Sequence, residues 1–384
     1  MPDSFPALRD RLAALGVLGP RRAARAWDGP AFEVRRSART VREVFGRSGP
    51  HASDARALYL DTETTGLAGG TGTIPFLIGL ASVEDGEIIT EQYFLRRLSG
   101  EVDMLETVRD RLAGADVLVT FNGRRFDWPI LEARFIMCRM RLEPPALHHD
   151  LISAARRLWY RPLGTYRLSV IERQALDIER GQDIESSEIP GLYLEYLRTG
   201  DGELLDPVFA HNRQDVACLL HLRRRVRRWI EDGEDPPAPV DWEGLGVLRL
   251  QASDEGGAED ALRRALGAED DPAVRWRIAT RLARILRRAA RWEELLTLWE
   301  REVGGRGVWR VRAFMEVAKV YQWRLRRPDR AISALEEAAG FIEWLLIRGD
   351  PASQALDDAV RRKLTRLQYL RRPARSAGRA PESS

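Results

Sequence analysis

The residues with the clearest chemical potential are two carboxylates at the end of an apolar run. Ala57 to Leu60 have the composition of a buried β-strand, and Asp61 and Glu63 follow with one residue between them. Because side chains alternate along a strand, we expect both carboxylates on one side, where they repel each other and lose hydration. A divalent cation between them would relieve that repulsion, and oxygen ligands of this kind suit Mg²⁺ or Mn²⁺. A solvated turn after the strand explains an isolated Asp-x-Glu pair equally well.

A second acidic motif follows a later apolar run, residues 117–121. Asn122 and Gly123 form a predicted turn there, and Asp127 opens a predicted helix that has Pro129 in its first turn. Asn122 could hydrogen-bond a nucleotide, and Gly123 could leave room for one. Capping a helix is a common role for aspartate, and it is the simpler explanation of Asp127 taken alone.

The third motif lies on a predicted helix from about residue 207 to residue 230. His211 and Asp215 are four residues apart in it and therefore share a helical face. A polar pair on the helix surface is the alternative for this motif alone. The chain has only two asparagines, Asn122 and Asn212, and both lie beside these two later motifs.

The elements between the motifs predict the scaffold that brings them together. Residues 75–83 and 88–95 form a predicted hairpin, a helix spans about 104–112, and residues 117–121 are a buried strand. This order fits a mixed sheet with flanking helices, in the ribonuclease H-like arrangement. The glycine-rich residues 66–73 lack the Gly-Lys-Ser/Thr ending of a phosphate-binding loop, and we interpret them as a mobile loop beside the carboxylates.

Taken together, the three motifs resemble those of the 3′–5′ exonuclease superfamily with four acidic metal ligands, the DnaQ-like branch of the ribonuclease H-like folds. The matching stretches are Asp61 to Leu67, Asn122 to Asp127 and His211 to Asp215, in this order along the chain. Within that branch the chain looks most like the YprB-type proteins. The resemblance covers about residues 55–228.

The resemblance implies four carboxylate ligands for two divalent ions: Asp61, Glu63, Asp127 and Asp215. In the superfamily, one ion lowers the pKa of the attacking water and the other stabilises the leaving 3′ oxygen. His211 would act as general base or orient the water, but its spacing is unusual. One branch has a histidine five residues before the last aspartate, and another has a tyrosine four residues before it. The hypothesis assigns substrate contacts to six further residues: Thr64, Thr65, Gly66, Asn122, Gly123 and Arg213.

The region between the second and third motifs contains His148 and His149, followed by Asp150. No cysteine or third histidine lies nearby at ligand spacing, so a zinc site is not favoured. Asp150 fits a helix cap or a residue that supports the site. The arginines and tyrosines of residues 156–167 would suit phosphate contacts and base stacking, or equally a solvated helix face.

We divide the chain into five parts. Residues 1–50 are arginine-rich and would track phosphates or form a solvated arm, and residues 51–230 hold the exonuclease-like domain. An acidic, proline-rich linker is predicted at 231–246. Residues 247–349 contain two weakly similar helix pairs that resemble tetratricopeptide repeats, and these predict either a groove for a protein partner or a stabilising helical cap. Residues 350–384 are a predicted final helix and disordered tail.

The composition bounds the class of protein. The 384 residues are 44% hydrophobic and 31% charged, with two cysteines and a net charge of +3. This length supports a sizeable core, the cysteines are too few for a disulfide framework, and the longest apolar run, 74–83, is too short to cross a bilayer. We therefore expect a cytoplasmic protein with reduced thiols and no membrane partner, and the charge permits a nucleic-acid partner.

The sequence predicts a metal-dependent nuclease, in the first place a 3′–5′ exonuclease on single-stranded ends of RNA or DNA. The rival from another class is a non-catalytic nucleic-acid-binding or scaffold protein that acts through its helical repeats. The complete set of four carboxylates argues against that rival. A metal-dependent endonuclease is a third option, because the same ions serve internal cleavage. The residues separate neither RNA from DNA nor exonuclease from endonuclease action.

Overall fold

The structure, a computed structural model, describes residues 29–40, 56–66, 72–178, 184–237, 239–349 and 352–371. The chain divides into two compact units, Met1–Asp241 and Trp242–Ser384, and each is described by itself. Three predictions lie outside the described residues. They concern most of the arginine-rich segment (1–28 and 41–50), the centre of the glycine-rich loop (67–71) and the tail after residue 371.

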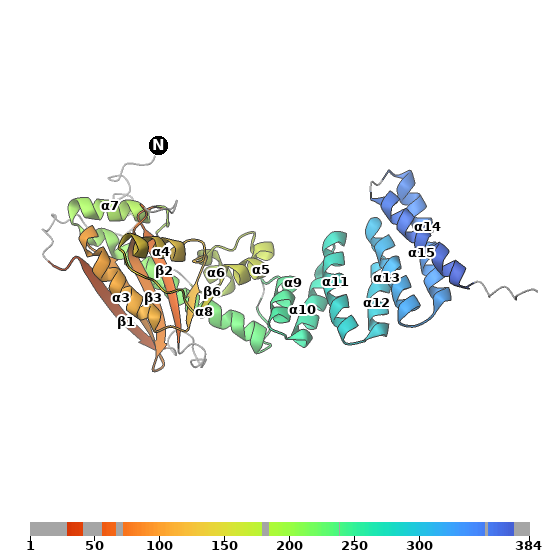
Figure 1. The fold of residues 1–384 in the computed structure, drawn as a ribbon, viewed down its shortest axis with the longest axis horizontal. Coiled ribbons are helices and arrows are strands. Elements are labelled where there is room, and N and C mark those ends of the chain that lie inside the picture. Colours follow the sequence, from red (N-terminus) through yellow and green to blue (C-terminus); the bar gives the residue numbers. More distant parts are fainter. Residues whose placement is uncertain are drawn as a thin grey trace, which may run out of the picture. The chain divides into compact units, whose positions relative to one another are not determined.

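A six-stranded mixed sheet forms the centre of the first unit (Figure 1). Its strands lie in the order β1-β4-β3-β2-β5-β6, with β1 at Phe32–Thr40, β2 at Ala57–Thr64, β3 at Pro75–Glu84, β4 at Glu87–Leu95, β5 at Val117–Thr120 and β6 at Leu147–Asp150. β2, β5 and β6 run parallel, whereas β3 is antiparallel to both β2 and β4. The carboxyl ends of the three parallel strands therefore meet at one edge of the sheet. This arrangement confirms the predicted ribonuclease H-like mixed sheet.

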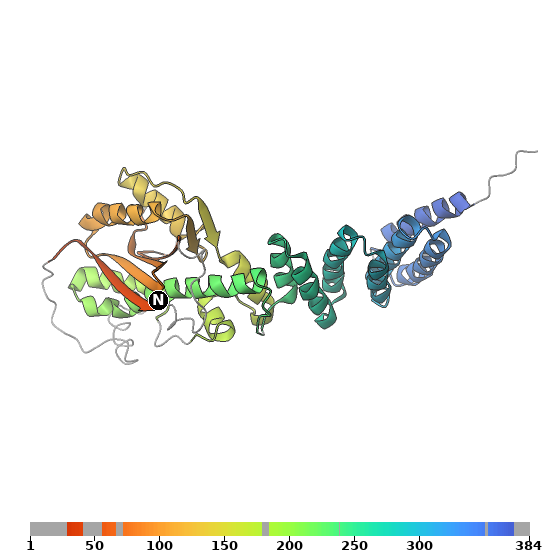
Figure 2. The same cartoon turned by 90° about the horizontal axis from the view of Figure 1, so that it is seen from below.

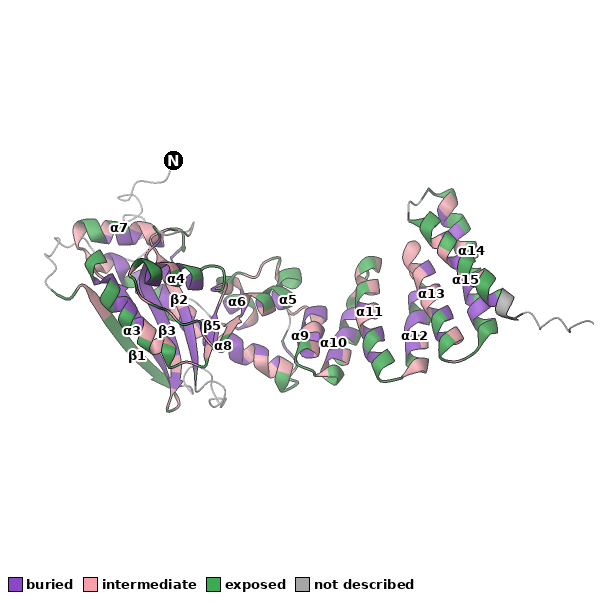
Figure 3. Ribbon diagram, viewed as in Figure 1, coloured by how far each residue is buried: buried purple, intermediate pink, exposed green. Residues whose placement is uncertain are grey.

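Helices cover both faces of this sheet. They are α3 (Glu101–Ala113), α4 (Asp127–Met137), α5 (Ile152–Leu163), α6 (Leu168–Ala175), α7 (Ile189–Thr199) and α8 (Asp206–Glu231), with short 3₁₀ segments at Leu98–Gly100 and Gly202–Leu205. α8 contacts β2, β3 and β4, and α3 contacts β1 and β4. Figure 2 shows α3 (orange) and the long α8 (green) on opposite sides of the sheet. β3 is consequently buried along nearly its whole length, whereas β1 at the edge is largely exposed (Figure 3).

Two strands were not predicted from the sequence. Residues 32–40, which were assigned to an arginine-rich arm, form β1 and pair antiparallel with β4. Two arginines of this strand pair with acids, Arg35 with Glu33 at 2.7 Å and Arg36 with Glu84 at 3.1 Å. Charged side chains are typical of edge strands, where they hide the alternation of apolar residues that reveals other strands. β6 was missed for a different reason, because its sequence Leu-His-His-Asp has no apolar run.

The second unit is helical, as predicted. It consists of α9 (Trp242–Gln251), α10 (Glu255–Ala268), α11 (Pro272–Arg288), α12 (Trp292–Glu302), α13 (Val308–Trp323), α14 (Pro328–Ile347) and α15 (Ser353–Arg371). Each helix packs on the next along the chain. α9 begins inside the predicted linker 231–246, so the segment between α8 and α9 is shorter than expected. The assignment of this unit to tetratricopeptide repeats stays a prediction.

Tryptophans contribute to the core of the helical unit, but not all of them are buried. Trp276 packs against Trp299 with ring centroids 5.0 Å apart and against Trp309 at 5.8 Å, so these rings join α11, α12 and α13. Trp323 is 60% exposed and Trp344 is 46% exposed, so these two side chains lie largely outside the core. Trp344 instead stacks on Phe341, one turn earlier in α14.

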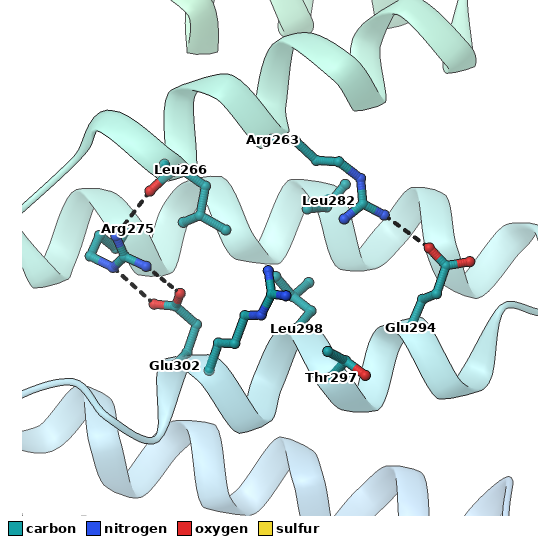
Figure 4. Close-up of a pocket in the computed structure, with 10 residues that line it drawn as sticks. Arg263, Leu266, Arg275, Leu282, Glu294, Thr297, Leu298 and Glu302 are labelled. Atoms are coloured by element: carbon teal, nitrogen blue, oxygen red, sulfur yellow. Dashed lines mark hydrogen bonds and ion pairs between the residues drawn. The ribbon is translucent and has the colours of Figure 1, made fainter.

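A pocket of about 480 Å³ lies among α10, α11 and α12 of this unit (Figure 4). Two ion pairs cross it, Arg263 to Glu294 at 3.1 Å and Arg275 to Glu302 at 2.6 Å. Because these charges are already paired across the pocket, they hold neighbouring helices together.

Two further expectations concern the whole chain. Among the described residues, no helix is long and apolar enough to cross a membrane. Both cysteines are free thiols, and Cys218 is buried whereas Cys138 is partly buried.

Candidate active site

Asp61 and Glu63 lie inside β2 rather than after it, because the strand continues to Thr64. Both carboxylates approach α8. Asp61 accepts a hydrogen bond from Asn212 of that helix, and Glu63 lies 3.9 Å from His211 of the same helix. The predicted placement of the two carboxylates on one side of the strand is therefore confirmed. Glu63 is only 8% exposed.

A row of three residues across the sheet positions Asp61. Gln92 in β4 pairs with Gly79 in β3, and Gly79 pairs with Asp61 in β2. The side chain of Asn212 lies over Gly79, where a Cβ atom would come within 2.2 Å of its Oδ1. Gln92 Nε2 donates to Asn212 Oδ1 at 3.0 Å, and Asn212 Nδ2 donates to Asp61 Oδ2 at 2.9 Å. This chain of hydrogen bonds fixes both the Asp61 carboxylate and the height of α8 above the sheet.

His211 lies between carboxylates from two elements. Its Nε2 is 3.6 Å from Asp215 Oδ2, four residues later in α8, and 3.9 Å from Glu63 Oε1 in β2. The side chain is only 7% exposed. The spacing that differs from the superfamily pattern therefore still places the imidazole within the carboxylate group, because residues four apart share one helical face.

Asp127 belongs to the same region from the side of α4. It is the first residue of that helix, and Phe126, not Asp127, holds the N-cap position. Asp127 is 7% exposed, and its Oδ1 accepts a hydrogen bond from Thr62 Oγ1 at 2.6 Å. The simple capping role considered for Asp127 is therefore wrong, since its carboxylate is turned toward β2.

The carboxylates disturb each other electrostatically. Burial raises the pKa of Asp61 well above its usual value, and the charges of Asp215 and Asp127 raise it further, while His211 and Asn212 oppose the shift. Burial also raises the pKa of Asp127 to about 6, against the hydrogen bond from Thr62. Three acidic residues from β2, α4 and α8 therefore share one poorly hydrated region.

This electrostatic strain predicts a pH-dependent stability in the absence of divalent ions. Asp127 binds its proton more tightly in the folded chain, with a pKa of about 6 against 3.8 for the free side chain, so folding is favoured below pH 4 and that contribution is lost as pH rises through 6. The loss corresponds to at most about 3 kcal/mol. Urea unfolding in EDTA gives the free energy of unfolding at pH 5.0 and at pH 7.5. Asp127→Asn is expected to reduce the difference between these two values. An equal difference in the variant would contradict the assignment.

Asp150, at the end of β6, is a supporting residue whose exact role the sequence did not reveal. Its carboxylate accepts hydrogen bonds from three backbone N–H groups: Asn122 at 2.7 Å, Arg124 at 3.1 Å and Ile152 at 3.1 Å. Asn122 has a left-handed backbone, with φ of 67°. Asp150 therefore holds the turn that leads from β5 to Asp127, besides satisfying the start of α5 as predicted.

We expect Asp150→Ala to destabilise the protein by about 1–2 kcal/mol, because two partly buried backbone donors and one exposed donor lose their acceptor. Urea denaturation measures this loss. Asp150→Asn is the matched variant, which keeps one acceptor oxygen and should be affected less. If Asp150→Ala were as stable as the unmodified chain, the anchoring role would be refuted.

The six predicted substrate-contact residues lie around this edge, but several have structural duties. Thr64 Oγ1 donates to the Gly66 carbonyl at 2.8 Å, and Thr65 bonds Ile74 through both its backbone and its side chain, which closes the base of the glycine-rich loop. Gly123 faces Thr120, whose side chain a Cβ would meet at 2.4 Å, so packing alone requires glycine there. Arg213 is exposed. Their contact with substrate stays a prediction.

The metal-ligand role also stays a prediction. Among the described residues, no three Asp, Glu, His or Cys side chains are already arranged as a metal-ligand set. Two carboxylates instead accept hydrogen bonds from neighbours, Asp61 from Asn212 and Asp127 from Thr62. The chemistry of the donors nevertheless fits a hard divalent cation, because buried oxygen ligands of like charge gather here.

The sequence contains no signal for three residues that build the site: Thr62, Gly79 and Gln92. Each acts across the sheet or between elements far apart in the chain. Thr62 and Asp127 are 65 residues apart, and Asp61 and Asn212 are 151 apart. The scarcity of asparagine did point to Asn212.

Comparisons with known proteins agree with this architecture. Residues 58–227 match the family described as the RNase_H superfamily. The "Uncharacterized protein YprB" of Bacillus subtilis (strain 168) is 28% identical over 288 residues, which cover 73% of this chain and 68% of that protein. The family B DNA polymerase from the hyperthermophilic archaeon Pyrobaculum calidifontis aligns at 15% identity with a TM-score of 0.35, covering 59% of this chain but only 29% of the polymerase. The family match and the six-stranded mixed sheet show that this chain contains a ribonuclease H-like domain.

Proposed function

We propose that the chain is a metal-dependent nuclease, specifically a 3′–5′ exonuclease that acts on single-stranded ends of nucleic acid. The observation that supports this most is the group of carboxylates at the carboxyl edge of the parallel strands, where burial and then the charges of Asp215 and Asp127 raise the pKa of Asp61. Such a group is unfavourable without a cation. The similarity to the RNase_H superfamily supports nucleic acid as the substrate class.

Four residues would hold the ions: Asp61, Glu63, Asp127 and Asp215. Two bound Mg²⁺ or Mn²⁺ ions would supply an activated water and neutralise the charge of the scissile phosphate. The chain's own groups have separate tasks. Asn212 and Thr62 orient two of the carboxylates by hydrogen bonds. His211, which lies beside Glu63 and Asp215, would accept a proton from the attacking water.

A nuclease assay tests this proposal. Single-stranded RNA, single-stranded DNA and duplexes carrying a 5′ label are incubated with Mg²⁺, Mn²⁺ or EDTA. Asp61→Asn is the site variant. Asp85→Asn is its control, because it removes an exposed carboxylate from the hairpin turn of the same domain.

The proposal predicts a ladder that shortens from the 3′ end and is lost with EDTA and in Asp61→Asn but not in Asp85→Asn. Internal cuts with the same dependence would move the activity to an endonuclease. Binding without cleavage by the unmodified chain on every substrate would refute the nuclease and favour the scaffold. A protein partner for the helical unit and a cytoplasmic location stay predictions.

A further inference from the structure

A cavity of about 940 Å³ lies between the edge strand β6 and the C-terminal half of α8. We call it the β6–α8 groove. Its lining includes Val117 at the start of β5, Arg124 and Arg125 in the turn after β5, and all four residues of β6. A four-residue strand spans roughly 13 Å, and the groove follows β6 over this length. It lies outside the group of carboxylates described above.

The lining is rich in arginine. Three acidic residues and five arginines line the groove. The arginines are Arg56, Arg124, Arg125, Arg223 and Arg227. The acids are already engaged. Asp116 pairs with Arg56 at 2.9 Å, Glu231 pairs with Arg227 at 2.6 Å, and Asp150 accepts three backbone hydrogen bonds. Because five arginines stand against three acids, the groove carries an excess of positive charge.

His149 belongs to β6 and lines the groove. Burial lowers its pKa, and the charges of Arg223 and Arg227 lower it further. The neutral imidazole is therefore favoured, and it adds hydrogen-bonding capacity to the groove but no charge.

The turn after β5 connects the lining of the groove to the candidate active site along the chain. Arg124 and Arg125 line the groove, and Asp127 comes two residues after Arg125. Arg124 donates to the carbonyl of His148 in β6, which holds this turn against the edge strand. Arg125 is exposed and makes no side-chain ion pair or hydrogen bond to any described residue. The two arginines therefore mark the end of the groove that is closest in sequence to the carboxylates.

We propose that the β6–α8 groove binds the phosphodiester backbone of the single strand whose end lies at the carboxylates. This inference rests on the proposed nuclease function and adds the path of its substrate. The excess of arginine matches a polyanion, and contacts to phosphates are independent of base sequence. The choice of a single strand follows from the proposed action on single-stranded ends.

Binding measurements test the path separately from cleavage. We would measure fluorescence anisotropy of 5′-labelled (dT)₁₂ and (U)₁₂ in the Asp61→Asn background with Mg²⁺, at several salt concentrations. The groove variant carries Arg125→Ala and Arg227→Ala. The control carries Arg141→Ala and Arg198→Ala, an exposed loop arginine and a helical arginine paired with Glu195. Both proteins lose two positive charges from the same unit.

The groove variant should bind more weakly, and the slope of log K against log salt should fall by about 1.4, or about 0.7 per lost phosphate contact. The control should keep the slope of its Asp61→Asn parent. Equal slopes for groove variant and control, while the unmodified chain still degrades single strands, would overturn the groove and leave the nuclease intact. A comparable loss of duplex binding would overturn the choice of a single strand. If the unmodified chain neither cleaves nor binds, the nuclease fails and the groove fails with it.

Discussion

Asp61→Asn is expected to abolish cleavage and, in the absence of divalent ions, to make the protein more stable at pH 7. Burial and the charges of Asp215 and Asp127 raise the pKa of Asp61, so its ionised form is disfavoured in the folded chain. Asparagine has the same shape and no charge, and its carbonyl oxygen can still accept the hydrogen bond from Asn212. The substitution therefore removes repulsion while keeping the local packing.

The loss of cleavage should reach at least about 10³-fold, since a divalent ion contributes several kcal/mol to such reactions. Initial rates on a 5′-labelled single strand measure it. Calorimetric Tm values in EDTA and in Mg²⁺ measure the stability. Mg²⁺ should raise the Tm of the unmodified chain more than that of the variant, while Asp85→Asn should change neither quantity. A less stable Asp61→Asn protein in EDTA would refute the strained carboxylate group.

Gly79→Ala is the second change with a large expected effect, although Gly79 carries no functional group. A Cβ at this position would come within 2.2 Å of Asn212 Oδ1. Asn212 would have to move, which breaks its hydrogen bonds to Gln92 and Asp61 and lifts the helix that carries His211 and Asp215. We expect a loss of about 1–3 kcal/mol in stability from overpacking. Cleavage should fall by about 10²-fold, the effect of misplacing catalytic groups by about 1 Å.

A double-mutant cycle separates the clash from other effects of the extra methyl group. In an Asn212→Ala background the clash partner is gone, so adding Gly79→Ala should change stability little, and the two changes should be strongly non-additive. Urea unfolding and cleavage rates measure both quantities. Gly340→Ala is the control, because a Cβ there meets nothing within 4 Å, and alanine favours a helix. If the losses of stability caused by Gly79→Ala and Asn212→Ala were additive, the side-chain amide of Asn212 would not occupy the space above Gly79.

The acidic residues of the candidate site could be predicted because local spacing exposes them. Asp61 and Glu63 follow a run of apolar residues with the alternation of a strand, and His211 and Asp215 repeat at one helical turn. The hairpin of β3 and β4 was predicted from two apolar runs around Asp85-Gly86. Those elements, with the later strand and helices, were sufficient for the mixed sheet.

The residues that hold these acids in place could not be predicted, because their roles depend on register and on contacts distant in sequence. Gln92 is an ordinary polar residue in a strand until pairing sets it beside Gly79. Thr62 is understood only once α4 brings Asp127 to it. Asp150 was recognised as a cap or supporting residue, but its bond to the Asn122 backbone needs β5 and β6 to be neighbours.

The missed strand β1 shows a different limit. Its residues Arg35, Arg36 and Arg39 hide the alternation that identifies a strand, and they invited an assignment to phosphate binding. The strand is nonetheless paired along its length with β4, from Phe32 opposite Leu95 to Thr40 opposite Glu87. An edge strand such as β1 is held by backbone hydrogen bonds more than by buried side chains. The hydrophobic pattern alone therefore does not identify such a strand.

The central claim is that the carboxylates of β2, α4 and α8 form one site for divalent ions. Anomalous scattering from Mn²⁺ in crystals of the protein grown with MnCl₂ tests it most directly. We predict Mn²⁺ peaks within about 2.2 Å of carboxylate oxygens of Asp61 and of Asp127 or Asp215. Mn²⁺ bound only elsewhere, with Asp61 still hydrogen-bonded to Asn212 and no peak beside it, would contradict the claim.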